Sequence, residues 1–227
     1  MSLSSFLKFV EIRTKIASVI PFALGSTYSL YHYKSFKPYN FIIMFISLIA
    51  FDMATTAINN YCDYKKASKF YLDSCKAENI VIEGGIKEST ALVVIFSLLA
   101  IAVTFGIILT LNTNIIVLFI GVISFFIGIF YTFGPIPISR MPLGEVFSGF
   151  FMGFMILFLS IYIHIYDENI IGLVYKNSIL TLNVNIIEVF YIFLSSIPAV
   201  VGISNIMLAN NICDIESKKG SSTFKSN

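Results

Sequence analysis

Long apolar runs separated by short polar segments dominate this chain of 227 residues. Six runs approach or reach the roughly 20 apolar residues that a helix needs to cross a bilayer. Because the lipid core offers backbone groups no other hydrogen-bonding partners, each run predicts a transmembrane helix. The predicted spans are residues 16–33, 41–58, 91–111, 115–133, 146–166 and 187–208.

Composition supports the same fold class. Hydrophobic residues make up 57% of the chain and charged residues only 12%, which is far from the balance of soluble domains. We therefore expect an all-α, polytopic membrane protein that forms a single domain over residues 1–227. A bilayer is the expected environment, no nucleic acid is expected as a partner, and the sequence leaves the oligomeric state open.

The distribution of Lys and Arg predicts the orientation. With six spans, twelve of the fifteen basic residues fall on the side that holds both termini and the loops after the second and fourth spans. The other three are Lys34, Lys37 and Lys176. Since cytoplasmic flanks carry the basic excess, both termini should lie in the cytoplasm of a cell-membrane protein.

A pentapeptide of the form Asn-Asn-x-Cys-Asp occurs twice, as residues 59–63 and 210–214, each time directly after a predicted span. Both of these spans run from outside to inside, so both pentapeptides should emerge at the cytoplasmic face. On a continuing helix, residues four apart share a face, which groups the first Asn of each copy with its Asp. We expect the two copies to offer carboxylate and amide oxygens to one ligand.

Such oxygens suit Mg²⁺, which uses one or two protein carboxylates and keeps waters and substrate phosphates as its other ligands. A phosphate-bearing partner is therefore expected, and basic side chains near the pentapeptides would clamp a leaving phosphate. These basic residues are Arg13, Lys15, Lys65, Lys66, Arg140, Lys218 and Lys219. Zinc is the competing metal because Cys62 and Cys213 repeat with the motif, although two thiols alone favour it only weakly.

Four segments carry a resemblance to a known family, and in order and spacing they span nearly the whole chain. They are residues 10–25, 59–66, 131–145 and 210–216, the third containing Tyr-Thr-Phe-Gly-Pro-Ile-Pro and Leu-Gly-Glu. In these segments the chain resembles the UbiA superfamily of intramembrane prenyltransferases. It is most similar to the branch that prenylates 1,4-dihydroxy-2-naphthoate for menaquinone synthesis.

The resemblance implies a UbiA-like helical bundle and a reaction. Mg²⁺ held by the two motifs would bind the diphosphate of a polyprenyl diphosphate, whose departure leaves an allylic cation that an aromatic acceptor attacks. The matching metal ligands are Asn59, Asp63, Asn211 and Asp214, with Asp63 and Asp214 as the catalytic acids. Arg13, Lys66 and Arg140 would contact the diphosphate, and Tyr131 would line the pocket for the prenyl group or the acceptor.

The chain departs from the family pattern at several positions. Asn60, Ala67, Lys69 and Lys218 stand where family members carry further acids, which predicts weaker Mg²⁺ binding by simple electrostatics. The family typically has nine helices, so we expect a shortened bundle that lacks the last ones.

Asp52 lies within the second predicted span, where an ionisable group is expensive and indicates function by default. It shares a helical face with Asn59 and Asp63, and we expect it to extend the polar site into the prenyl or acceptor pocket. The alternative is an acid hydrogen-bonded to Thr55 or Thr56 for packing alone.

Two other functions stay open at this point. The paired polar helix ends would also suit a small transporter or lipid-binding protein, although transporters typically bind substrates near the midplane at broken helices. A prenyltransferase remnant without activity would have the same sequence pattern.

Overall fold

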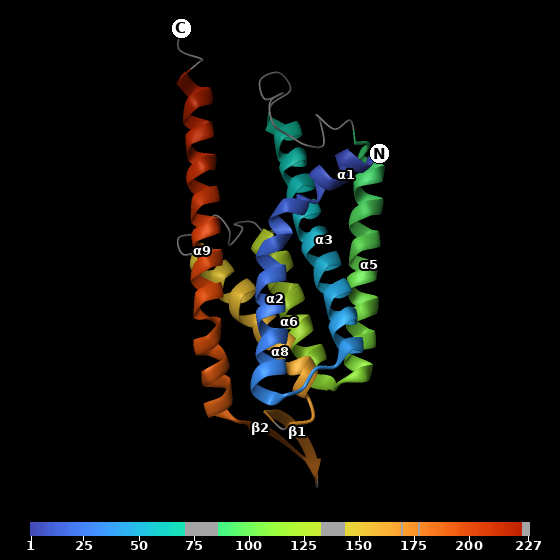
Figure 1. The fold of residues 1–227 in the computed structure, drawn as a ribbon. Helices are drawn as coiled ribbons and strands as arrows, with labels where there is room; N and C mark the ends of the chain where they lie inside the picture. Colours follow the sequence, from blue (N-terminus) through green and yellow to red (C-terminus); the bar gives the residue numbers. More distant parts are fainter. Residues whose placement is uncertain (71–85, 133–143, 169, 177, 224–227) are drawn as a thin grey trace.

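The computed structural model describes residues 1–70, 86–132, 144–168, 170–176 and 178–223, apart from some side chains near helix ends. Helices form nearly all of this part of the chain and stand side by side in one bundle (Figure 1). In chain order they are α1 (Leu3–Phe9), η1 (Ile12–Lys15), α2 (Ile16–Tyr28), η2 (Ser29–Tyr33), α3 (Pro38–Phe70), α5 (Glu88–Asn112), α6 (Ile115–Thr132), α7 (Gly144–Ser148), η4 (Gly149–Met155), α8 (Ile156–Ile165) and α9 (Ile186–Thr223). The helical membrane fold predicted from the apolar runs is confirmed.

Within the described residues, four helices are long and apolar enough to cross a membrane. They are Pro38–Lys65, Glu88–Asn112, Gly144–Ile165 and Ile186–Ile212. The other two predicted spans, 16–33 and 115–133, correspond to α2 with η2 and to α6, which are helical but shorter or less apolar by the same measure. Membrane-crossing length therefore supports four of the six predicted spans.

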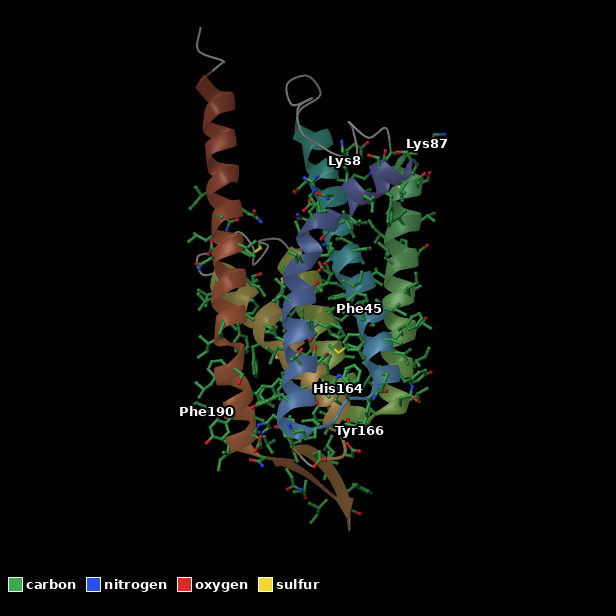
Figure 2. All side chains as sticks on the ribbon, viewed as in Figure 1. Lys8, Phe45, Lys87, His164, Tyr166 and Phe190 are labelled. Carbon is green, nitrogen blue, oxygen red and sulfur yellow. The ribbon has the colours of Figure 1, made fainter. Side chains whose placement is uncertain are left out.

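Apolar side chains cover the outside of the bundle as well as its core, as a helix in lipid requires. Val93, Phe96 and Leu111 on α5 and Phe190 on α9 are all more than half exposed. Figure 2 shows Lys8 and Lys87 at one end of the bundle and His164, Tyr166 and Phe190 toward the other. The arrangement separates two polar ends by an apolar belt.

Two glycines on neighbouring turns, Gly149 and Gly153, allow η4 and α9 to approach closely. A Cβ atom on Gly153 would lie 2.7 Å from the Val200 Cα atom, and one on Gly149 would lie 2.5 Å from the Val200 carbonyl oxygen. Small residues four apart are the usual means of close helix packing where lipid removes the hydrophobic driving force. This contact sets the position of α9, and with it the second pentapeptide.

The end of the bundle that carries Tyr166 is closed by side-chain hydrogen bonds and a short hairpin. Asn40 Nδ2 donates to the Ile163 carbonyl oxygen at 2.8 Å, and the Lys37 main-chain N–H donates to His164 Nδ1 at 3.1 Å. Strand β1 (Ile171–Lys176) pairs antiparallel with β2 (Ile179–Val184), with Ile171 opposite Val184. The sequence analysis predicted no strands between the fifth and sixth spans, because the hydrophobic pattern of this segment is too short to separate strand from loop.

Helices α3 and α9 run in the same direction and both continue past their predicted ends at residues 58 and 208 (Figure 1). Both pentapeptides are therefore helical, and both lie toward the same end of the bundle. The helical continuation on which the shared-face argument depends is present in each copy.

Candidate functional site

A cavity of about 1030 Å³ runs along the inside of the bundle between α2, α3, α5, α6, η4 and α9. Its lining on α3 extends from Met44 to Asp63, which corresponds to about 28 Å of helix at 1.5 Å per residue. Most of the wall is apolar, and polar side chains gather near the pentapeptides and around Asp52. The cavity is large for a small-molecule pocket and has the length that an extended apolar chain would need.

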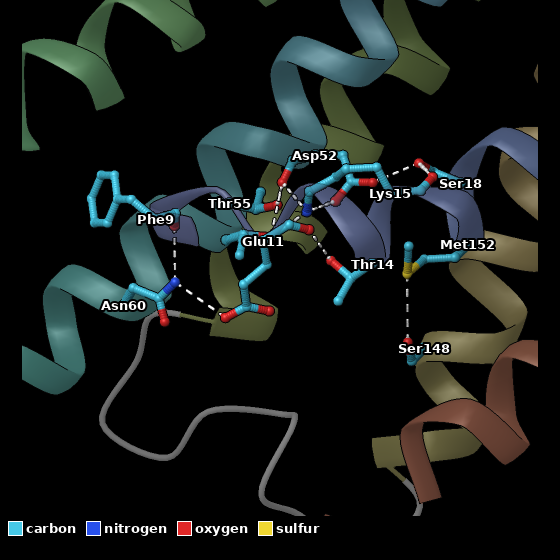
Figure 3. Close-up of polar contacts among 11 residues, drawn as sticks. Phe9, Glu11, Thr14, Lys15, Ser18, Asp52, Thr55, Asn60, Ser148 and Met152 are labelled. Atoms are coloured by element: carbon cyan, nitrogen blue, oxygen red, sulfur yellow. Dashed lines mark hydrogen bonds and ion pairs between the residues drawn. The ribbon is translucent and has the colours of Figure 1, made fainter. Parts of the chain in front are cut away.

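The first pentapeptide divides its side chains between the cavity and the N-terminal segment. Asn59 and Asp63, one turn apart on α3, both line the cavity. Asn60 does not belong to this lining, and its Nδ2 donates to the Phe9 carbonyl oxygen at 2.9 Å and to Glu11 Oε1 at 3.2 Å (Figure 3). Asn60 therefore fastens the N-terminal segment to α3.

Glu11 occupies the break between α1 and η1. Its backbone is in the left-handed region, with φ 48° and ψ 58°, and its side chain lines the cavity beside Asn59 and Asp63. A non-glycine residue in this conformation persists only where its surroundings hold it, and here the Asn60 amide contacts the carboxylate. The break thus brings an additional acid to the end of the cavity that carries both pentapeptides, which we call its mouth.

The second pentapeptide presents both of its amides to the cavity. Asn210 and Asn211 line the wall on α9, and Asn211 Nδ2 donates to Glu145 Oε1 at 2.7 Å. The NH₂ group of the Asn211 side chain donates to Glu145, so its carbonyl oxygen can accept a hydrogen bond or bind a cation. Asp214 lies three residues further along α9, and its side chain is outside the described part of the structure.

A buried charged pair lies deeper in the cavity, with Lys15 at the end of η1 and Asp52 on α3. Lys15 is only 4% exposed, and its Nζ contacts Asp52 Oδ1 at 2.8 Å, the Asp52 carbonyl oxygen at 3.1 Å and Thr56 Oγ1 at 2.5 Å (Figure 3). Ser18 Oγ donates to Asp52 Oδ2 at 2.5 Å. The expectation that Lys15 serves as a phosphate-facing cation is wrong, because its three donors are already engaged.

The Asp52 carboxylate is not bonded to the neighbouring threonines either. Thr55 and Thr56 donate their hydroxyls to the Asp52 main-chain carbonyl oxygen, at 3.0 and 3.1 Å. The carboxylate itself is bonded to Lys15 of η1 and to Ser18 of α2. Asp52 and Ser18 both line the cavity, and a role of Asp52 in the prenyl or acceptor pocket stays a prediction.

The remaining predicted residues are placed only in part. Arg13 is exposed and lines the cavity. Lys66 lies on α3 and Tyr131 on α6, but their side chains are outside the described part of the structure, and Arg140 lies outside the described residues altogether. The contacts predicted for these three residues stay predictions.

The donor set around the mouth fits a hard cation held by few protein ligands. Among the residues that the structure describes, no three His, Cys, Asp or Glu side chains are grouped as a metal cluster would require. The cavity instead offers the Asp63 carboxylate together with the amides of Asn59, Asn210 and Asn211. Such oxygen donors suit Mg²⁺ that completes its shell with waters and phosphate oxygens, and they do not suit a thiolate zinc site.

The sequence motifs indicated no site role for Glu11, Ser18 or Glu145. Each acid instead contacts the second Asn of one pentapeptide, so the repeat includes a Glu from another segment in each half. The partners are 49 and 66 residues apart, and no local spacing in the sequence indicates them. In the sequence, Glu11 and Glu145 stand out only because they lie in segments 10–25 and 131–145, which carry the family resemblance.

Comparison with known proteins identifies a family and a relative that resemble this chain. The sequence pattern of the UbiA prenyltransferase family matches residues 18–221. The chain is 29% identical over 209 residues to the 1,4-dihydroxy-2-naphthoate octaprenyltransferase of Bacillus subtilis (strain 168), which covers 91% of this chain and 59% of that protein. The chain thus spans about three fifths of the length of this relative, and no solved structure matches it.

The match covers both pentapeptides and most of the residues that line the cavity, and it extends from within α2 to within α9. With apolar helices of membrane-crossing length, it indicates a multi-pass membrane protein. The chain belongs to the UbiA prenyltransferase family.

Proposed function

We propose that the protein transfers a polyprenyl group from a polyprenyl diphosphate to an aromatic acceptor, with 1,4-dihydroxy-2-naphthoate as the first acceptor to test. The observation that supports this most is the single cavity lined by both pentapeptides and continued by a long apolar wall. A diphosphate at the polar mouth would leave its isoprenoid tail against that wall. The choice of acceptor follows the name of the Bacillus relative.

The reaction breaks the allylic carbon–oxygen bond, and its electron pair leaves with the diphosphate. A ring carbon of the acceptor then forms the new carbon–carbon bond, and the ring proton at that carbon is lost. Asp63, Asn59, Asn211 and Asp214 are proposed to hold Mg²⁺, which when bound neutralises charge on the departing diphosphate. Arg13, with Lys66 and Arg140, is proposed to bind phosphate oxygens, and Tyr131 and Asp52 to line the pocket for prenyl group and acceptor.

We also propose that the mouth of the cavity and both termini face the cytoplasm. The polar headgroup of the prenyl diphosphate and Mg²⁺ would then reach the pentapeptides from the cytoplasmic side. The basic excess near the N-terminus, after α3 and after α9 supports this orientation.

Membranes that contain the full chain should be incubated with labelled polyprenyl diphosphate, Mg²⁺ and either 1,4-dihydroxy-2-naphthoate or 4-hydroxybenzoate. The proposal predicts a prenylated product that depends on Mg²⁺ and is lost in Asp63→Asn. Folded wild-type protein that forms no product with either acceptor would contradict the enzymatic proposal and favour an inactive relative or a transporter. An uptake assay in vesicles separates those two.

A further inference from the structure

The Lys15–Asp52 pair lies too far from the pentapeptides to bind the same phosphate group. Asp52 precedes Asn59 by seven residues and Asp63 by eleven, which places it about 10 and 16 Å further along α3. The cavity continues beyond it, since Met44 on the same helix also belongs to the lining. The pair therefore stands midway along the cavity, between the proposed diphosphate site and the apolar inner wall.

The two residues of the pair differ in their remaining hydrogen-bonding capacity: Lys15 has used all of its donors, whereas Asp52 can still accept hydrogen bonds. Lys15 Nζ has three donors and three acceptors within reach, so it has none left to offer a ligand. An ionised carboxylate has about four acceptor sites, and Asp52 uses one on each oxygen, toward Lys15 and Ser18. The Asp52 side chain is 13% exposed against 5% for Lys15, so the group that the cavity meets is a hydrogen-bond acceptor.

Aromatic surface adjoins this acceptor. The rings of Phe51 and Phe125 stack with centroids 4.5 Å apart and an interplanar angle of 29°, and both residues line the cavity. Gly128 makes room for this pair, because a Cβ atom there would lie 2.7 Å from Phe51 Cζ. A flat ring would thus find stacking partners next to a carboxylate.

A ligand with only apolar atoms beside Asp52 would take the remaining lone pairs of its carboxylate out of water without giving them a partner, which is costly. An anionic group placed against Asp52 would be repelled by its carboxylate, and Lys15 has no free donor to bind it. A ring that carries a hydroxyl group satisfies both requirements, since the hydroxyl donates and the ring stacks.

We propose that Asp52, held by Lys15 and Ser18, accepts a hydrogen bond from a hydroxyl group of the aromatic acceptor and so selects hydroxylated rings. This rests on the proposed function and adds the residue that would recognise the hydroxyl group of the acceptor. A hydrogen bond donated by the hydroxyl also leaves more electron density on the ring, which favours attack on an allylic cation. Lys15 and Ser18 are positioning residues that fix the carboxylate.

Binding without turnover tests this directly. The full chain in lipid nanodiscs is titrated with 4-hydroxy-2-naphthoate and with 2-naphthoate, followed by the fluorescence of the naphthalene ring, without Mg²⁺ or prenyl diphosphate. The two probes differ only in the hydroxyl group, and the wild-type protein should bind the hydroxylated one about tenfold or more tightly. The variant Lys15→Met/Asp52→Leu replaces the pair by apolar side chains of similar volume and should bind both probes equally.

Asp167→Asn, at the far end of the bundle, is the control and should keep the wild-type preference. A wild-type protein with no preference, or a double variant that keeps it, would overturn the proposal. If the double variant does not fold, the wild-type comparison and Asp52→Asn still decide, because Asp52→Asn should reduce the preference. In the transfer assay, changes at Asp52 should raise KM for the acceptor and leave KM for the prenyl diphosphate unchanged, so this inference can fail while the proposed function stands.

Discussion

The two pentapeptides share a sequence pattern, a helical conformation and one end of the bundle, yet they use their amides differently. In the first, Asn59 faces the cavity and Asn60 holds the N-terminal segment. In the second, Asn210 and Asn211 both line the cavity, and Asn211 donates a hydrogen bond to Glu145. The difference follows from the neighbours, because Phe9 and Val10 pack against Ala57 on α3, whereas α9 packs against α7 and η4.

This comparison shows that the second Asn of the motif lines the cavity in one copy and anchors a neighbouring segment in the other, according to the segment beside it. In each copy the aspartate is the residue that carries a formal negative charge, and Mg²⁺ is usually held through carboxylates. The largest effects are therefore expected at the aspartates.

Replacing Asp63 by Asn should lower kcat/KM by about 100-fold or more, because it removes a carboxylate proposed to hold the Mg²⁺ that would neutralise charge on the departing diphosphate. The measurement is prenyl transfer at several Mg²⁺ concentrations. Asp167→Asn is a matched control at the opposite end, and its activity should equal that of the wild type. Activity of Asp63→Asn within about threefold of the wild type would show that the first pentapeptide is not at the reacting centre.

Alanine at the second Asn of each copy should separate the two roles. Asn60→Ala should lower the free energy of unfolding by about 1–3 kcal/mol, because the Phe9 carbonyl oxygen and Glu11 lose their donor, with KM near the wild-type value. Asn211→Ala should instead raise KM for the prenyl diphosphate about tenfold with a smaller loss of stability. Thermal unfolding and steady-state kinetics distinguish them, and equal changes in KM would contradict the structural difference.

Glu145→Gln should have a smaller effect, about threefold on KM, because a glutamine oxygen still accepts from Asn211 but without the charge that strengthens the bond. Glu145→Ala should approach the effect of Asn211→Ala. If Glu145→Ala is silent while Asn211→Ala is not, the acid does not position the amide.

The opposite end of the bundle provides the smallest expected effect. The hydrogen bond from Lys37 lowers the pKa of Asp167 below its ordinary value. A carboxyl with a lowered pKa stabilises the fold above the ordinary Asp pKa and loses that contribution as the pH falls through the lowered value. Since the Asp167 side chain is 61% exposed, Lys37→Met should change stability at pH 7 by less than about 1 kcal/mol, and the difference should vanish in acid.

The sequence by itself determined the fold class, the helical continuation of both pentapeptides and the family. The physical reason is that these features depend on local properties, namely apolar runs, helical periodicity and short motifs. It did not determine the hairpin 171–184, because six-residue strands have too few positions for a periodic signal.

Only the tertiary structure decided which polar group faces which partner. The sequence predicts that Lys15 is a phosphate-facing cation near the membrane surface. In the structure, its ammonium group instead bonds to the carboxylate of Asp52, 37 residues away. Glu11 and Glu145 likewise acquire their roles from amides on other helices. A polar side chain in an apolar bundle must find a partner, and helix packing determines which one lies within reach.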